Sequence, residues 1–122
     1  MNDLELIHHH LMSRIETTEE FPFGPQAAVY KVAGKMFALL IPEDVPPRMN
    51  LKCAPDRALT LRDEYEAIIP GYHMNKKHWN TLLLDGSLPE DFVIELIDHS
   101  LELVIKGHPR ATRERLTEAL NS

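Results

Sequence analysis

The chain has 122 residues, which is enough for one domain with a single buried core. Its apolar fraction of 43% and charged fraction of 26% are ordinary for a soluble globular protein. Apolar runs such as residues 37–41 are far shorter than the roughly 18 residues of a membrane span. We expect no signal peptide, and the single Cys53 excludes an internal disulfide and suits a reducing cytoplasm.

Charge is unevenly distributed along the chain, around a net formal charge of −6. Residues 1–20 hold five acids and one base, and residues 81–102 hold six acids and no base. Residues 21–60 and the last twenty residues each sum to +2. The acids fall mostly on expected helices and the bases mostly on expected strands. Because a uniformly acidic protein would repel a phosphate backbone, this segregation bears on the choice of partner.

The first half of the chain predicts one helix followed by three strands. Apolar residues recur at helical spacing over residues 3–16, behind a capping Asn2 or Asp3, and prolines end the pattern. Gly34 supplies the positive φ that a tight hairpin requires. The predicted strands are residues 28–32, 35–41 and 48–54, with a stiff proline-rich loop at residues 42–47.

The middle of the chain predicts a second helix and further extended structure. A proline at the first position suits a helix over residues 55–65, and residues 68–71 are expected to form a turn. Residues 72–84 are expected to be extended, with a turn or wing at residues 75–79 and a strand at residues 81–84.

A long helix is predicted next. It begins at Ser87-x-x-Glu90, which we interpret as a capping box, and ends at Gly107 and Pro109. A short basic tail, residues 110–122, has the pattern of one more short helix. One apolar stripe runs along the long helix, and we expect it to cover the sheet. The stripe consists of Val93, Leu96, Ile97, Leu101, Val104 and Ile105.

This order of elements predicts an α+β fold of two layers, an antiparallel sheet covered on one face by helices. The order is helix, three strands, helix, one or two strands, helix. The other face of the sheet would then meet solvent. Alternation along the third strand places Met49, Leu51 and Cys53 on one side and a polar stripe on the other. The stripe consists of Arg48, Asn50 and Lys52.

Several short segments resemble the MmcQ/YjbR family across about residues 1–109, which we take as the domain. The longest and most distinctive is residues 70–80, and residues 110–122 lie outside the resemblance. The segments are PFG at 22–24, VYKV at 29–32, GKMFA at 34–38, LKC at 51–53, PGYHMNKKHWN at 70–80, LIDHS at 96–100 and KG at 106–107.

The resemblance implies a fold like that of secretion-chaperone-like or CyaY-like two-layer domains. It also implies DNA binding, through strand-turn-strand wings that contact phosphates. On that hypothesis the basic side chains contact phosphates, while Asn75 and Trp79 contact nucleobases or sugars. Six phosphate contacts would give a salt slope of about −5. The candidate nucleic-acid-binding residues are Lys31, Lys35, Arg48, Lys52, His73, Asn75, Lys76, Lys77, His78 and Trp79.

Each of these signals also has an ordinary structural interpretation. Trp79 suits an anchor in the sheet core, and the lysines suit a solvated rim. The net charge of −6 opposes DNA binding unless the acidic helices face away from the duplex.

We find no sequence signature of a catalytic, metal or cofactor site, and expect none. His8, His9 and His10 are consecutive, so on a helix they fan around the axis and do not converge on an ion. His73 and His78 lack a third ligand at a diagnostic spacing. Cys53 suits a small buried hydrophobe, because no neighbouring base would activate it.

A second class of function is binding of a protein or peptide by the exposed sheet face, as a chaperone or adaptor would. The two hypotheses differ in the surface they require. A basic stripe on that face favours nucleic acid, whereas an apolar patch of several hundred Å² favours a protein partner. We therefore expect a non-enzymatic binding module, monomeric or homodimeric, with DNA as the first candidate partner and a protein or peptide as the alternative.

Overall fold

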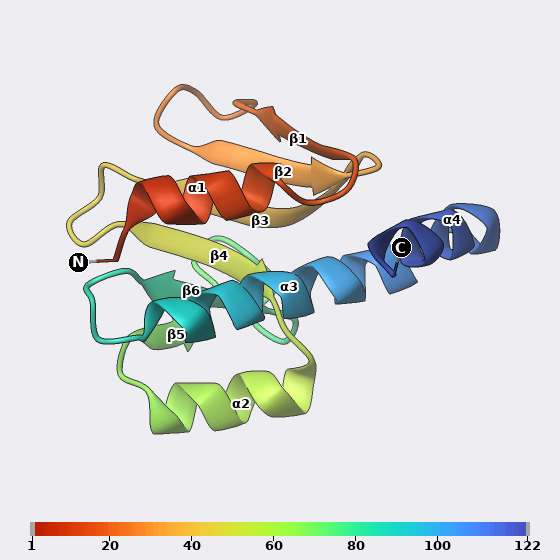
Figure 1. The fold of residues 1–122 in the computed structure, drawn as a ribbon. Coiled ribbons are helices and arrows are strands. Elements are labelled where there is room, and N and C mark those ends of the chain that lie inside the picture. Colours follow the sequence, from red (N-terminus) through yellow and green to blue (C-terminus); the bar gives the residue numbers. More distant parts are fainter. Residues whose placement is uncertain (1, 122) are drawn as a thin grey trace.

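The computed structural model describes residues 2–121 as a six-stranded antiparallel sheet with helices packed against one face (Figure 1). Spatial strand order is β1-β2-β3-β4-β6-β5. The expected α+β, two-layer fold is therefore confirmed. The elements are α1 (Leu4–Met12), β1 (Thr17–Glu20), β2 (Ala28–Val32), β3 (Lys35–Ile41), β4 (Arg48–Lys52), α2 (Pro55–Glu64), β5 (Ile68–Pro70), β6 (Trp79–Leu83), α3 (Glu90–Lys106) and α4 (Arg110–Leu120).

The helices α1 and α3 cross the sheet on the side nearest the viewer in Figure 1, and α2 lies beside α3. The core is the layer between these helices and the sheet, and it includes the fully buried Tyr30, Phe37 and Met49. All six residues of the apolar stripe on α3 are buried, as the periodicity predicted. No helix among residues 2–121 is long and apolar enough to cross a membrane.

The β2–β3 hairpin forms at the bounds that the sequence predicts. Its turn has Ala33 at φ 46° and Gly34 at φ 86°, both in the left-handed region. Glycine has no Cβ to resist this conformation, so the tight connection is possible.

Both outer strands are absent from the sequence prediction. The first helix ends at Met12, where Ser13 caps it, and does not reach residue 16. Glu16 then turns the chain at φ 47°, and β1 pairs along β2 with Thr17 opposite Val32. Strand β1 is short and polar, so it lacks the alternation of apolar residues by which a strand is predicted from sequence. At the other edge, residues 68–70 form β5 where a turn was expected.

The predicted capping box at Ser87 and Glu90 is wrong. Helix α3 begins after Pro89, and the hydroxyl of Ser87 instead donates to Asp85 Oδ1 at 2.6 Å. The carboxylate of Glu90 accepts hydrogen bonds from the backbone N–H of Asp3 at 2.8 Å and from Asn2 Nδ2 at 3.1 Å. Asn2 and Asp3, at the start of the chain, therefore bind the Glu90 carboxylate that the sequence pattern assigned to the cap of α3.

Ser100 of α3 joins the helical layer to the sheet where β3 and β4 stop pairing. Its hydroxyl donates to Phe37 O at 2.6 Å and accepts from the backbone N–H of Lys52 at 2.9 Å. Both backbone groups would otherwise be unsatisfied inside the protein.

The C-terminal segment forms the helix α4, which projects beyond the end of α3 in Figure 1. Its Leu116 is fully buried in the main core, so this helix packs onto the residues 1–109 that precede it. Arg115 pairs with Glu16 at the turn before β1.

Candidate functional site

The sheet face that lies away from the helices carries an apolar surface of its own. Ala27, Val29 and Leu39 are buried there, and Met36 and Ile41 pack against them. These side chains form a cluster separate from the main core. Because no helix in the described part of the chain packs on this apolar face, another segment has to shield it from water, and the loop of residues 71–78 shields part of it.

A hollow of about 350 Å³ lies on this open face, and we call it the open-face hollow. Leu39 and Ile41 of β3, with Ala27 just before β2, form its floor, and the two walls are Phe23 on one side and residues 72–74 on the other. Its lining is almost wholly apolar, although Asn50 and His73 border it. The lining residues are Phe23, Ala27, Leu39, Ile41, Asn50, Tyr72, His73 and Met74.

A buried polar network holds the wall that residues 71–78 form. Asn50 Nδ2 donates to Tyr72 O at 3.1 Å, and Thr81 Oγ1 accepts from Tyr72 N at 2.9 Å. The Thr81 hydroxyl in turn donates to Asn50 Oδ1 at 2.6 Å. Because both side chains are buried and satisfied, the loop lies at a fixed height above the sheet.

The proposed polar stripe of β4 is therefore wrong for Asn50, which is only 4% exposed. Alternation placed its side chain on the correct face. The loop of residues 71–78, which follows α2 and β5 in the chain, covers that face, so Asn50 makes a structural contact with it.

Arg62 of α2 fixes the other end of the same loop. Its Nε donates to Asn80 Oδ1 at 2.7 Å, and its Nη2 donates to the carbonyl oxygens of Lys76 and Trp79. Gly71 also approaches β6 closely, because an added Cβ would lie 2.8 Å from Trp79 Cβ. The sequence analysis did not single out Arg62, since only the tertiary fold brings α2 to this loop.

The rim of the open-face hollow combines aromatic rings with positive charge. The Arg48 guanidinium lies 5.3 Å from the centre of the Tyr72 ring, and the rings of Tyr72 and His73 are 4.0 Å apart. His73 has φ 59°, a conformation that non-glycine residues adopt at some cost. Arg48 Nε is buried without a hydrogen-bond partner among residues 2–121, and Asp44 Oδ2 lies 3.6 Å away.

The predicted phosphate-binding lysines divide into two groups. Lys31 Nζ pairs with Glu20 Oε1 at 3.1 Å, and Lys35 Nζ donates to Gly107 O at the end of α3. Within residues 2–121, the side chains of Lys52, Lys76 and Lys77 have no hydrogen-bond or ion-pair partner. The structure thus leaves only part of the predicted basic set available to a ligand.

The remaining candidates lie along the 71–78 loop and the start of β6. Asn75 Oδ1 accepts from the backbone N–H of Lys77 at 2.9 Å, which stabilises the turn. His73 is exposed, whereas His78 and Trp79 are half-buried. Trp79 lies opposite Lys52 in the β4–β6 pairing.

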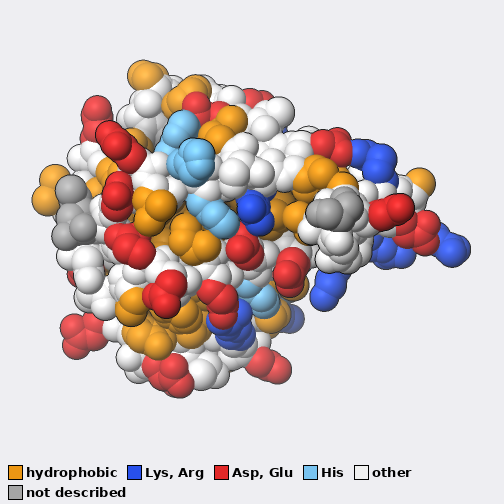
Figure 2. Space-filling view, in the orientation of Figure 1, with side chains coloured by type: hydrophobic (Ala, Val, Ile, Leu, Met, Phe, Trp, Pro, Cys, Tyr) orange, Lys and Arg blue, Asp and Glu red, His pale blue; other side chains and the backbone are white. Residues whose placement is uncertain are grey.

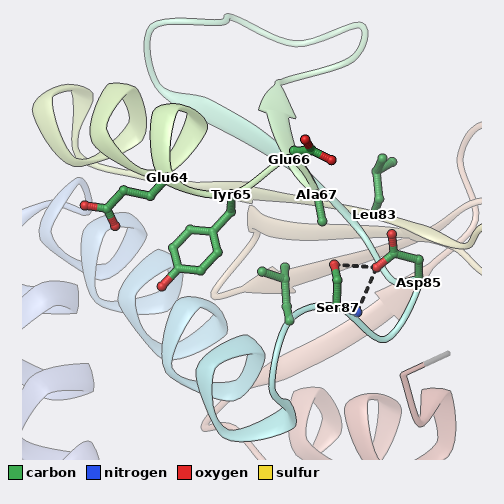
Figure 3. Close-up of a pocket in the computed structure, with 8 residues that line it drawn as sticks. Glu64, Tyr65, Glu66, Ala67, Leu83, Asp85 and Ser87 are labelled. Carbon is green, nitrogen blue, oxygen red and sulfur yellow. Dashed lines mark hydrogen bonds between the residues drawn. The ribbon is translucent and has the colours of Figure 1, made fainter.

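A separate acidic hollow of about 350 Å³ lies beside the end of α2, and Figure 3 shows its lining. Glu64, Glu66 and Asp85 border it, but their carboxylates point in different directions in the figure. Asp85 accepts from the side chain and backbone of Ser87, which lowers its pKa. Among residues 2–121, no three His, Cys, Asp or Glu side chains are placed to hold a metal.

Burial favours the neutral form of two groups with chemical reactivity, Cys53 and His99. Cys53 is buried, and this burial raises the pKa of its thiol, so the thiolate is disfavoured. Burial lowers the pKa of His99, whose Nε2 accepts the backbone N–H of Ala54 at 3.3 Å. The arrangement offers apolar contact and charge at the open face, which suits binding.

Charged side chains are unevenly distributed on the helix-covered face. Figure 2 shows Asp and Glu side chains spread across the helices, while Lys and Arg gather at the projecting α4 end. Several acids there are tied to basic partners, such as Asp98 with His10 at 2.8 Å and Glu95 with Arg57 at 2.6 Å.

The structure is a small two-layer α+β domain with an apolar hollow on its uncovered sheet face. The family model described as YjbR matches residues 12–103. The chain belongs to the YjbR family, so the resemblance stated from the motifs is confirmed.

Curated relatives agree with this assignment. YbdF of Escherichia coli O157:H7 is 38% identical over 96 residues, covering 79% of each chain. YjbR of Escherichia coli K12 is 33% identical over 93 residues, 76% of this chain and 79% of the relative. YyaQ of Bacillus subtilis 168 is 30% identical over 113 residues, 81% and 95% of the two chains. All three names describe uncharacterized proteins.

Solved structures confirm the fold. The Deinococcus radiodurans protein DR2400, described with the domain DUF419, matches with a TM-score of 0.88 and 36% identity, over 96% of this chain and 89% of that one. A Pseudomonas syringae protein matches with a TM-score of 0.68 and 31% identity, over 82% and 96%.

Proposed function

We propose that this YjbR-family domain is a non-enzymatic binding module whose open sheet face takes an acidic segment of a partner protein. An apolar side chain of that segment fills the open-face hollow. The observation that carries the proposal is the hollow itself: about 350 Å³, almost wholly apolar, and bordered by an exposed Phe23 and Tyr72. An apolar patch of several hundred Å² was the feature expected from the sequence to favour a protein partner; the hollow and the exposed Phe23 and Tyr72 rings are the apolar surface on this face.

The affinity would come mainly from burial of apolar surface. Filling the hollow with one Leu- or Phe-sized side chain contributes about 1.5–3 kcal/mol. Phe23 is 66% exposed in the free protein, so contact with a partner also removes its ring from water. The floor of Leu39 and Ile41 is held by strand pairing, and therefore little reorganisation opposes binding.

We propose an acidic partner because the side chains around the open-face hollow include several basic ones. Arg48 and the exposed His73 stand beside the hollow, and Lys52, Lys76 and Lys77 extend the positive charge along β4 and the loop. Complementary charge across an interface speeds association and excludes partners of the wrong sign. The acidic helices of this domain also repel an acidic segment from the opposite face.

The test uses a fluorescent acidic peptide with a central Phe between Asp and Glu residues, and fluorescence anisotropy. Two peptides serve as controls, one with Ala at the centre and one with lysines in place of the acids. We expect only the acidic Phe peptide to bind. Phe23→Ala should weaken that binding, whereas Leu6→Ala should not, because Leu6 is a similarly exposed apolar residue on α1. Equal binding by the Phe and Ala peptides would contradict the proposal.

A specific observation also supports DNA as a second candidate. Lys52, Lys76 and Lys77 are not engaged within the protein, and the loop carries Asn75 beside them. Because Lys31, Lys35 and Arg48 have internal partners, we expect about three phosphate contacts and a salt slope near about −2.7. Anisotropy with duplex and single-stranded DNA across a salt series, with Lys76→Glu/Lys77→Glu as the variant, tests it. Binding that the double variant abolishes and Phe23→Ala leaves intact would favour DNA.

A further inference from the structure

A second apolar hollow lies on the helix side of the sheet, between the first turns of α1 and the strands β1 to β3. Its volume is about 350 Å³, and its lining is almost entirely apolar. Leu4, Ala28, Leu40 and Pro42 supply much of the surface, and the half-exposed ring of Phe21 stands at one side. We call this space the α1 hollow. It is separated from the open-face hollow by the sheet.

A set of three polar side chains borders the α1 hollow. Glu19 Oε2 accepts the hydroxyl of Tyr30 at 2.7 Å and pairs with His8 Nε2 at 2.9 Å. Both contacts use the same oxygen, so Glu19 Oε1 has no hydrogen-bond partner among residues 2–121. Burial and the neighbouring Glu19 carboxylate raise the pKa of Tyr30, and its hydroxyl therefore stays a donor. Together, Tyr30 and His8 hold Glu19 in place beside the apolar surface.

The charge around the α1 hollow selects for a cation. Glu5, His8 and Glu19 border it, and within residues 2–121 no lysine or arginine does. A helix N-terminus attracts anions through its free N–H groups, but here Asp3 Oδ1 accepts those of Glu5 and Leu6, each at 3.1 Å. The polar groups that remain are the Glu5 carboxylate and the Glu19 carboxylate, the second of which is held on one oxygen by His8 and Tyr30.

We propose that the α1 hollow binds a small organic cation, a primary amine attached to an apolar or aromatic group. The ammonium group donates to Glu19 Oε1 and lies near Glu5. The apolar part packs on Leu40 and beside the Phe21 ring. An ammonium over an aromatic face gains further electrostatic stabilisation. The volume agrees with the lower end of small-molecule sites, about 300–1,000 Å³.

The experiment titrates tryptamine into the ¹⁵N-labelled full chain and follows backbone amides by NMR. Indole-3-propionate, which has a similar shape and the opposite charge, is the ligand control. Glu19→Gln is the test variant, because glutamine still accepts from Tyr30 while the charge is lost. Glu20→Gln is the matched control: the neighbouring acid lies on the opposite side of β1 and pairs with Lys31.

We expect tryptamine to shift amides of α1, β1 and β2, and indole-3-propionate to leave them unchanged. Glu19→Gln should weaken tryptamine binding about tenfold, the size of one charge-assisted hydrogen bond, and Glu20→Gln should change it less than about twofold. Equal binding of the two ligands, an unaffected Glu19→Gln variant or shifts confined to the open face would each overturn the proposal. The peptide experiment above is independent of this outcome.

Discussion

The two faces of the sheet are covered in different ways. On one face, α1, α2 and α3 bury a continuous core that contains the fully buried Tyr30 and Phe37. On the other, a single loop held by Asn50 and Arg62 covers only part of a smaller apolar cluster. The helical layer mainly stabilises the fold, with the α1 hollow at its edge, whereas the partial cover on the other face leaves the open-face hollow bordered by the exposed Phe23 and Tyr72. This difference is why we propose the open face as the surface that binds a partner protein.

The largest expected effect separates the two faces by their contribution to stability. Leu101→Ala, in the helical core, should lower the free energy of unfolding by about 3 kcal/mol, because it leaves an enclosed cavity. Leu39→Ala, on the floor of the open-face hollow, should cost only about 1.5 kcal/mol, since the space beside it is already open. Urea unfolding of both variants measures the difference, and equal losses would contradict the comparison.

A second prediction concerns the network under the loop. Asn50→Ala should lower the free energy of unfolding by about 2 kcal/mol, because Tyr72 O and the Thr81 hydroxyl lose a buried partner. Hydrogen exchange should rise at residues 71–78 and stay unchanged in α3. Uniform faster exchange throughout the chain would show that Asn50 serves the whole core and not the loop.

A smaller effect is expected for the arginine that fixes the loop. Arg62→Ala should destabilise the protein by about 1 kcal/mol, through the loss of its bonds to Asn80 and to backbone carbonyls. Arg57→Ala is the control on the same helix, because its half-exposed pair with Glu95 contributes about 0–1 kcal/mol. Loop hydrogen exchange should increase only in the Arg62 variant. An equal increase in loop hydrogen exchange in the Arg62→Ala and Arg57→Ala variants would contradict a specific role of Arg62 in fixing the loop.

The smallest expected effect is the pH dependence from His99, on the helix-covered face. Burial lowers its pKa in the folded state below the ordinary 6.5, so the unfolded chain binds the proton more readily. Its contribution to stability is therefore complete above pH 6.5 and declines as the pH falls towards the lowered pKa. We expect the stability difference between wild type and His99→Gln to shrink from pH 7.5 to pH 5. A difference that is constant across this range would contradict the assignment.

Local patterns in the sequence predicted much of the fold. The bounds of β2 and β3 and the buried stripe of α3 follow from apolar periodicity and from Gly34, which act over a few residues. The capping box at Ser87 failed because Asn2, far away in sequence, binds Glu90 instead. Strand β1 was missed because it is short, polar and paired on one edge only.

The site was less predictable than the fold. Alternation placed Asn50 on the open face, but it gave no sign that residues 71–78 fold back over that face and bury it. Phe23 was noted only within a motif, and Arg62 not at all, since each acts through residues distant in sequence. Whether Lys31 and Lys35 are available to a ligand depends in the same way on their partners, Glu20 and Gly107, and for Lys35 that partner is distant in sequence.

The most direct test of the central claim is a map of where the acidic Phe peptide binds. The measurement is an NMR titration of the ¹⁵N-labelled chain, which follows the backbone amides of both faces together. We predict shifts at residues 23–27, 39–41 and 71–74 that saturate with the peptide, and none along α1 or α3. Shifts on the helical face, or none at any peptide concentration that the solution allows, would contradict the claim that the open-face hollow is the binding site.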